Sequence, residues 1–226
     1  MVGASREPKT LIAQQSAPRP ARRTPARLPA PAKQFSLDAA TPRPHLTPMI
    51  LPPPEQIDAA TRAFCAAISP AEPLYVPVAP APASRLAYCF DNSVAQAAAQ
   101  GGSAVYGWAI WRWPGRWFEA EHHAVWRSPT GTLIDVTPHE GDPPRILFLP
   151  DESAPYDPAT FRRNIMAPEA GNPLARAYIA LVAERSDITD GYWEPGMDVL
   201  PLFTEEDQRR IGAIDGRMAE LREAMA

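Results

Sequence analysis

The sequence has little cysteine and almost no lysine. Only two cysteines, Cys65 and Cys89, occur in 226 residues, and their spacing matches neither a disulfide framework nor a zinc-binding motif. Such sparse thiols are typical of a reducing compartment, so we expect a cytoplasmic location. Lys9 and Lys33 are the only lysines, and the heavy use of arginine and alanine indicates a GC-rich bacterial or phage genome.

Long hydrophobic runs are absent as well. No stretch approaches the roughly 20 apolar residues that cross a bilayer. The N-terminus also lacks an apolar segment ahead of a small-residue cleavage site, which a secretory signal requires. These absences predict a protein without a membrane span, a secretory signal or a membrane partner.

Glycine is scarce beside proline, with 12 glycines against 29 prolines. The prolines crowd residues 1–54, where each fixes φ and removes a backbone donor, so this stretch is predicted to be a disordered tail. Through residue 45 the tail carries eight cations and two acids, which leaves 14 cations and 24 acids for the remainder. An acidic body argues against a nucleic-acid partner, because phosphate contacts require clustered lysine and arginine. The basic tail is interpreted as a solvated segment without a function of its own, and RNA, an acidic protein partner and the body of this chain are the alternative contacts for it.

Residues 55–84 are predicted to form a helix and a second proline-rich linker. One face of the helix, over 55–68, carries three apolar side chains: Ile57, Phe64 and Ile68. Cys65 lies beside this stripe and is interpreted as a buried filler rather than a nucleophile. The prolines of residues 73–84 predict a segment without regular structure.

Residues 85–150 are predicted to form an α+β core. Segment 89–100 is rich in alanine and glutamine and is followed by two glycines, which favours a helix with Cys89 in its first turn. Four segments of strand character follow: 103–113, 116–128, 132–138 and 145–150. A helix followed by a meander of four strands predicts an antiparallel sheet and excludes a doubly wound nucleotide-binding fold.

Residues 151–226 are predicted to be a C-terminal extension with two helices. Asn172 is placed to cap the first, with Pro173 at its first position. Thr204 is placed to cap the second, with Asp207 three residues later. The second helix has an apolar stripe that docks on the core or meets a partner helix, and docking is the expectation.

One group of core residues is suited to covalent catalysis. A thiol at a helix N-terminus beside an imidazole ionises readily and attacks carbonyl carbons. Cys89 has the helix position. Strand 116–128 supplies two candidate imidazoles, His122 and His123, which point to opposite faces.

The turn at 128–131 distinguishes between the two histidines. Its Ser-Pro-Thr-Gly sequence predicts a three-residue hairpin loop, which places Val125 opposite Asp135. His123 is then a diagonal neighbour of Asp135 on the same face, within hydrogen-bonding reach. A one-residue slip of the register would substitute His122. The predicted catalytic residues are Cys89, His123 and Asp135.

The order of these residues resembles the transglutaminase-like branch of the papain-like cysteine hydrolase superfamily. It comprises a cysteine at a helix start, a histidine in a strand that reads His-Ala-Val-Trp, and an aspartate in the next strand, Ile-Asp-Val-Thr-Pro. The chain is also similar to protein N-terminal glutamine amidohydrolases, whose Tyr-Cys-x-x-Asn helix start is echoed by Tyr88, Cys89 and Asn92. The likeness covers residues 88–138, and the Tyr-Asp-Leu-Asp-Thr motif of those enzymes is reduced here to Ile-Asp-Val-Thr.

The resemblance implies a fold and an activity. The fold would be a papain-like core in which the helix that carries the cysteine packs on an antiparallel sheet. The activity would be that of a cysteine-dependent amide hydrolase without a cofactor: an amidase, deamidase or peptidase. Cys89 would attack a peptide or protein amide to form a thioester, His123 would act as general base and acid, and Asp135 would orient the imidazole.

Further residues are candidates for substrate contact. The Asn92 side chain, together with the backbone amide of Cys89, is suited to hold an oxyanion. Trp108 is one of five tryptophans on neighbouring strands, which either line an apolar substrate cleft or pack the sheet. Glu119 and Glu121 are interpreted as a solvated strand face.

Two other functions fit the same residues. A zinc site would use Cys89, one of the paired histidines, Asp135 and His139, although none of these has the close ligand spacing of common zinc motifs. Alternatively, the fold is a non-enzymatic protein-binding module that uses the basic tail and the last helix.

Overall fold

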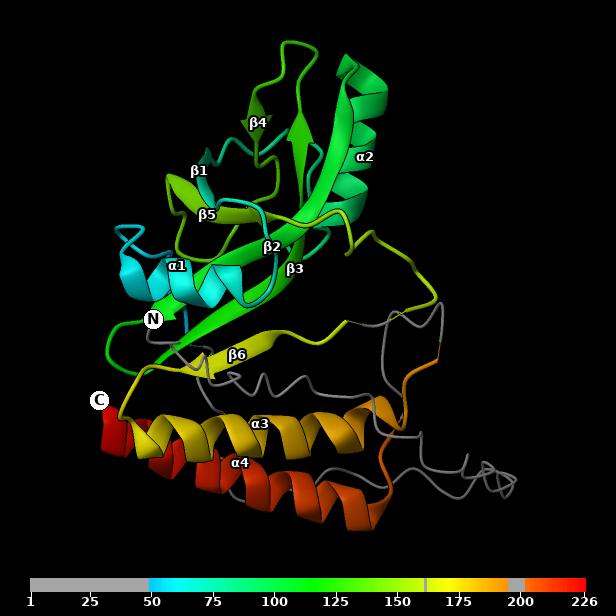
Figure 1. The fold of residues 1–226 in the computed structure, drawn as a ribbon. Coiled ribbons are helices and arrows are strands. Elements are labelled where there is room, and N and C mark those ends of the chain that lie inside the picture. Colours follow the sequence, from blue (N-terminus) through cyan, green and yellow to red (C-terminus); the bar gives the residue numbers. More distant parts are fainter. Residues whose placement is uncertain (1–48, 161, 195–201) are drawn as a thin grey trace, which may run out of the picture. The chain divides into compact units, whose positions relative to one another are not determined.

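The computed structural model describes residues 49–160, 162–194 and 202–226. All of them belong to one compact unit that spans residues 43–226. Within the described ranges the chain forms four helices and a six-stranded antiparallel sheet, so the predicted α+β class is confirmed (Figure 1). No helix in these ranges is both long enough and apolar enough to cross a membrane.

A long hairpin forms the centre of the sheet. Its strands, β2 (Ser103–Trp113) and β3 (Trp117–Arg127), pair along their whole length. Strand β5 (Arg145–Pro150) pairs with the other edge of β2, and β1 (Leu74–Pro77) pairs with β5. The predicted meander is therefore wrong, because β5 crosses over and lies beside β2 instead of β4 (Leu133–Ile134). Strand β5, whose apolar side chains are buried, therefore lies between β1 and β2.

The outer edge of β3 is divided between two short strands. Strand β6 (Ile165–Pro168) pairs with the first four residues of β3, and β4 pairs with its last two. Helix α2 (Cys89–Gln100) packs at the stretch between them, where the Ser93 hydroxyl donates to the carbonyl of Ala124 over 3.1 Å. Helix α2 thus packs against the middle of β3, where neither β4 nor β6 pairs with this strand.

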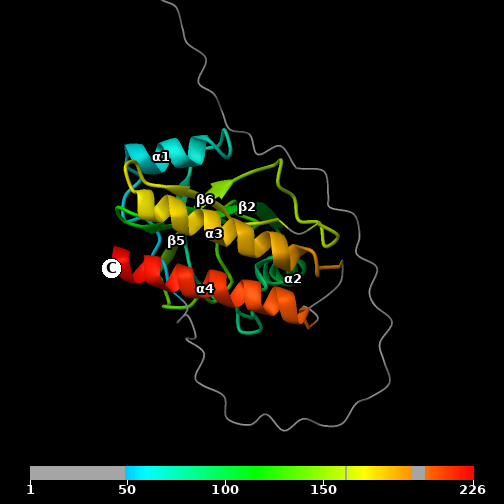
Figure 2. The ribbon, with the colours of Figure 1, turned by 90° about the horizontal axis from the view of Figure 1, so that it is seen from below.

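The two faces of the hairpin pack against different helices. Alternate side chains of β2 and β3 meet helix α1 (Ala59–Ala66), where Phe64 stacks on Phe118 with ring centroids 5.1 Å apart. On the opposite face, Trp117 stacks on Tyr178 at 4.7 Å. Tyr178 belongs to helix α3 (Pro173–Asp190), which lies side by side with α4 (Glu205–Met225) in Figures 1 and 2. The predicted docking of the C-terminal helices is confirmed.

Three segments predicted without regular structure belong to the folded body. Strand β1 forms inside the second proline-rich linker, and β6 forms after Asp151, in a stretch for which no helix or strand was predicted. Residues 49–54 are not part of a free tail, because the carbonyl of Pro52 accepts from the Arg112 amide and that of Pro54 from the Tyr75 hydroxyl. The remainder of the predicted tail, residues 1–48, lies outside the described residues.

The predicted helix caps are present. The Asn172 side chain accepts from the amide of Ala175 at 2.9 Å, and Thr204 accepts from that of Asp207 at 3.2 Å. Helix α1 is shorter than predicted, because Asp58 caps it and so fixes its start at residue 59. Cys65 is fully buried in the core beneath it, as expected.

Candidate functional site

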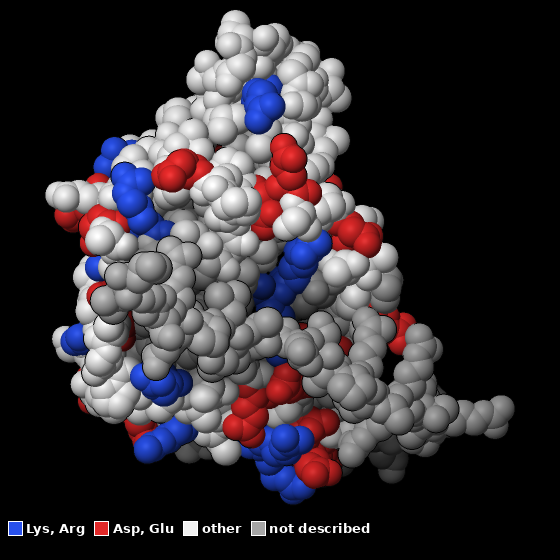
Figure 3. Space-filling view, in the orientation of Figure 1, with Lys and Arg blue, Asp and Glu red and all other residues white. Residues whose placement is uncertain are grey.

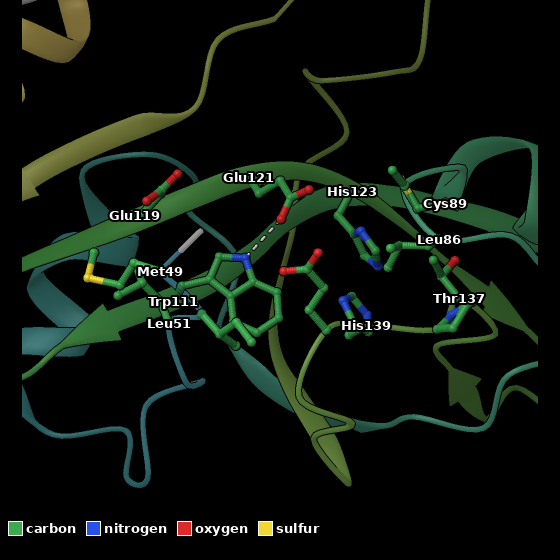
Figure 4. A pocket seen from close by; sticks show the side chains of 14 residues that line it. Met49, Leu51, Leu86, Cys89, Trp111, Glu119, Glu121, His123, Thr137 and His139 are labelled. Atoms are coloured by element: carbon green, nitrogen blue, oxygen red, sulfur yellow. Dashed lines mark hydrogen bonds between the residues drawn. The ribbon is translucent and has the colours of Figure 1, made fainter. Parts of the chain in front are cut away.

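A cavity of about 330 Å³ opens on the face of β3 opposite α1 (Figure 4). The described residues that line it come from the start of α2, the middle of β2 and β3, the loop after β4, and the segment that precedes α1. They are Met49, Ile50, Leu51, Leu86, Ala87, Cys89, Trp111, Glu119, Glu121, His123, Thr137, Pro138, His139 and Glu140. We call this cavity the cleft. It contains two of the three predicted catalytic residues, and the third lies directly behind it.

The hairpin turn places His123 against Asp135 as predicted. The amide of Ser128 donates to the carbonyl of Thr132, and the backbone at Gly131 is left-handed, with a φ of 90°. In the resulting register Trp126 pairs with Ile134. His123 Nε2 then lies 2.9 Å from Asp135 Oδ2.

Cys89 is the first residue of α2 and lies next to the imidazole of His123 (Figure 4). The chain reverses just before it, through Ala87, which has a φ of 66°. Because Nε2 of His123 is occupied by Asp135, the Nδ1 side of the ring remains for the thiol. Cys89 is 7% exposed and is one of the residues that line the cleft.

Electrostatics couple these buried groups. Burial alone lowers the pKa of His123, but the charge and hydrogen bond of Asp135, with a smaller contribution from Cys89, raise it well above its usual value. For Asp135, burial raises the pKa, but His123 and His139 outweigh this effect and hold it below its usual range. Both effects favour an ionised pair, a protonated imidazole beside a carboxylate.

His139 lies beside His123 and Asp135, although the sequence predicted it only as a ligand of a zinc site. Its Nε2 donates to the same Oδ2 atom of Asp135 over 2.7 Å, and its ring packs edge-on against Trp111. The amide of Thr137 donates to Asp135 Oδ1 over 2.9 Å. The spacing of four residues between Asp135 and His139 is the only signal in the sequence that could have suggested this contact.

Two predicted site residues lie away from the cleft. His122 points to the opposite face, where its Nε2 donates to the carbonyl of Ala154, so it cannot replace His123. Trp108, a predicted substrate contact, packs in the core of that same face and donates to Asp151 over 2.9 Å. Trp111, three residues later, lines the cleft instead because its side chain points the other way from the strand.

Asn92 holds the loop before Cys89 rather than facing the cleft. Its amide nitrogen donates to the carbonyl of Arg85 and to the Thr137 hydroxyl, and its oxygen accepts from the Arg85 amide. Both of its donor hydrogens are therefore used within the protein. The backbone amides of Cys89, Phe90 and Asp91, at the start of α2, have no acceptor within the helix.

Glu119 and Glu121 line the cleft and are half-buried, in contrast to the solvated face expected for them. Glu121 accepts from the Trp111 indole over 3.0 Å, and Glu119 accepts from the Asn164 amide over 2.7 Å. Burial raises the pKa of Glu119 above its usual value. The alternation of the strand predicts that these residues share a face with His123, but not what covers that face.

His123, Asp135 and His139 also form a cluster that could hold a metal ion, with ligand atoms within 4.8 Å of one another. The separations from Asp135 Oδ2 to the two imidazole nitrogens, 2.9 and 2.7 Å, are those of hydrogen bonds. Ligand atoms around tetrahedral zinc, with bonds of about 2.0–2.1 Å, stand roughly 3.3 Å apart. A zinc site here would therefore require the side chains to spread.

Comparison with protein-family models, curated proteins and solved structures finds no match to this chain.

Proposed function

We propose that this protein is a cysteine-dependent amide hydrolase with a transglutaminase-like core. The observation that carries the proposal is the hydrogen bond of 2.9 Å between His123 Nε2 and Asp135, with Cys89 on the other side of the ring. A nucleophile, a base and a carboxylate that orients the base are the parts of a catalytic triad. The sulfur and the ring line one cavity, so a substrate that enters it meets both.

The fold supports the same reading. The helix that begins with Cys89 packs against the hairpin strand that carries His123, and Asp135 follows the neighbouring strand β4. A cysteine helix packed on an antiparallel sheet, with histidine and aspartate on adjacent strands, is the arrangement implied by the transglutaminase-like resemblance.

In the first half of the reaction, His123 holds the proton that the Cys89 thiol has released, and the Cys89 sulfur attacks the carbonyl carbon of the amide. The oxygen of the tetrahedral intermediate carries the negative charge, and the backbone amides at the start of α2 stabilise it. The carbon–nitrogen bond then breaks. His123 gives its proton to the departing amine, and a thioester remains on Cys89.

In the second half, water replaces the amine. His123 removes a proton from the water, whose oxygen attacks the thioester carbon, and the carbon–sulfur bond breaks. Cys89 is released as a thiolate beside the protonated imidazole, and the acid leaves. Asp135 keeps the imidazole in one orientation through both halves and stabilises its protonated form.

The test is turnover of a panel of peptides and peptide amides, with the acyl-enzyme followed by intact mass. Cys89→Ala and His123→Asn should each lower turnover by more than about 10³-fold while thermal unfolding stays cooperative. Cys65→Ala is the matched thiol control and should turn over normally. Full turnover by Cys89→Ala would refute the proposal.

A zinc site is the second candidate, because His123, Asp135 and His139 approach one another in the described structure. Elemental analysis of the purified chain distinguishes the two. One zinc per chain, lost in His139→Ala and retained in Cys89→Ala, would favour the metal site over the triad.

A further inference from the structure

Acidic side chains continue along the cleft from the proposed catalytic imidazole. Glu121 and Glu119 lie two and four residues before His123 on β3 and share its face, as Figure 4 shows. We call these two residues the glutamate row. With about 3.3 Å per strand residue, their backbone positions stand roughly 7 and 13 Å from that of His123. Glu140 adds a third carboxylate to the lining.

The charge of the glutamate row has no counterion within the described part of the chain. Glu121 and Glu119 accept hydrogen bonds only from neutral groups, the Trp111 indole and the Asn164 amide, and neither is in an ion pair there. The described lining contains no lysine or arginine. Acidic and basic side chains are, by contrast, interspersed on the face seen in Figure 3. Apart from the two imidazoles, which are hydrogen-bonded to Asp135, the charged side chains of the described lining are therefore all acidic.

Partial burial makes an unpaired carboxylate costly, because its charge loses water without gaining a partner. A structural role does not require that charge, since a glutamine oxygen would accept equally well from Trp111 or Asn164. What the carboxylates add is attraction for a cation. The Trp111 ring beside Glu121 adds an aromatic surface, which favours ammonium and guanidinium groups further.

We infer that the cleft selects substrates with a lysine or arginine side chain within about two residues of the amide that is cut. This inference rests on the proposed function, since it names the substrate class of the same cleft. An extended peptide advances by the same distance per residue as β3 does. A cation two residues from an amide held at Cys89 and His123 would therefore lie level with Glu121.

The first test compares turnover of matched peptides that differ only in arginine or its neutral isostere citrulline. Arginine should raise kcat/KM by at least about tenfold, and Glu121→Gln should reduce this preference about fivefold. Glu206→Gln, which removes a charge from the exposed first turn of α4, is the control and should leave the preference unchanged. Equal turnover of both peptides would overturn the inference.

The second test does not need turnover. Cationic and anionic methanethiosulfonates both modify thiols, and their rates with Cys89 are measured separately. The cation-to-anion rate ratio for Cys89, divided by the same ratio for a free thiol in solution, reports the electrostatic potential at the Cys89 sulfur. The cation should be favoured by about fivefold for each carboxylate near the thiol, and Glu119→Gln and Glu121→Gln should each lower the ratio. A ratio equal to that of the free thiol would overturn the inference even if peptides are cleaved. A high ratio with no cleavage of any peptide would show that the cleft favours cations but would refute the proposed hydrolase, and with it the inferred substrate class.

Discussion

Asp135 Oδ2 accepts hydrogen bonds from two imidazoles, and the contact with His139 is shorter than the contact with His123, 2.7 Å against 2.9 Å. With Thr137 on the other oxygen, the carboxylate is held on three sides. His139 and Thr137 therefore fix the plane of this carboxylate independently of the His123 ring.

Loss of His139 should weaken the alignment of this pair. We expect His139→Ala to slow alkylation of Cys89 by iodoacetamide about tenfold, because Asp135 can then turn away from His123. His139→Gln, whose amide can still donate to the carboxylate, should restore part of the rate. Rates followed by peptide mass mapping test this. Unchanged rates in both variants would mean that Thr137 and His123 suffice to hold Asp135.

Replacement of Asp135 should have the larger effect. Asp135→Asn keeps the shape but removes the charge that favours protonated His123, so turnover should fall about 10²–10⁴-fold. The variant should also lose about 2–3 kcal/mol of unfolding free energy, because two imidazoles lose a charged acceptor. Urea unfolding measures the second effect. A loss of turnover without any loss of stability would contradict the buried network.

The unfolding free energy should depend on pH through His123. Its pKa in the folded chain lies well above 6.5, so above pH 6.5 the folded state holds a proton that the unfolded state has released. Stability from this group is fully present below pH 6.5 and is lost as the pH rises toward the folded value. Urea unfolding from pH 6 to 9 should show this slope in the natural chain and a flatter one in His123→Gln. Equal dependence of the unfolding free energy on pH in the two proteins would contradict the raised pKa of His123.

The two thiols should differ strongly in reactivity. Burial raises the pKa of Cys65 to about 11, so at neutral pH on the order of one Cys65 thiol in ten thousand is ionised, and its side chain is sealed from solvent. Cys89 lines the cleft. Iodoacetamide should therefore modify Cys89 alone in the folded protein and both cysteines in urea. Equal labelling of both under native conditions would contradict the structure.

Gly107 should tolerate no side chain. It pairs with His123 across the hairpin, and a β-carbon there would lie 2.2 Å from the carbonyl oxygen of Leu149. Gly107→Ala should therefore destabilise the fold by about 3 kcal/mol and disturb the register at His123. Gly212→Ala on α4, where nothing lies within 4 Å, is the control and should stabilise by about 0.5–1 kcal/mol. Thermal unfolding of both variants decides.

Local signals predicted the parts of the fold that depend on neighbouring residues. The turn at 128–131 fixed the register that joins His123 to Asp135, and the caps Asn172 and Thr204 marked the starts of α3 and α4. In each case the physical cause lies within a few residues, so the sequence pattern is sufficient.

Pairing between distant segments could not be predicted in this way. Strand β1 contains a proline and is only four residues long, and it exists because β5 offers it a free edge some 70 residues later. The position of β5 beside β2 likewise depends on a crossover that no local pattern marks. The cleft shares this origin, since Met49 and His139 both line it although they lie 90 residues apart in the chain. Trp108 was wrongly predicted to contact substrate, because local patterns do not show which face of the hairpin α1 covers.

Because two short strands share the outer edge of β3, the proposed catalytic groups lie toward one end of this strand and the contacts with the C-terminal helices lie toward the other. The sulfur, ring and carboxylate gather near the end held by β4, whereas β6 joins the other end to α3, and none of the described cleft lining comes from β6, α3 or α4. Evolution or design could therefore replace the C-terminal extension without changing the relative positions of Cys89, His123 and Asp135. New recognition would then come from residues 49–51, Pro138 and Glu140, which border the cleft and have no part in the proposed reaction.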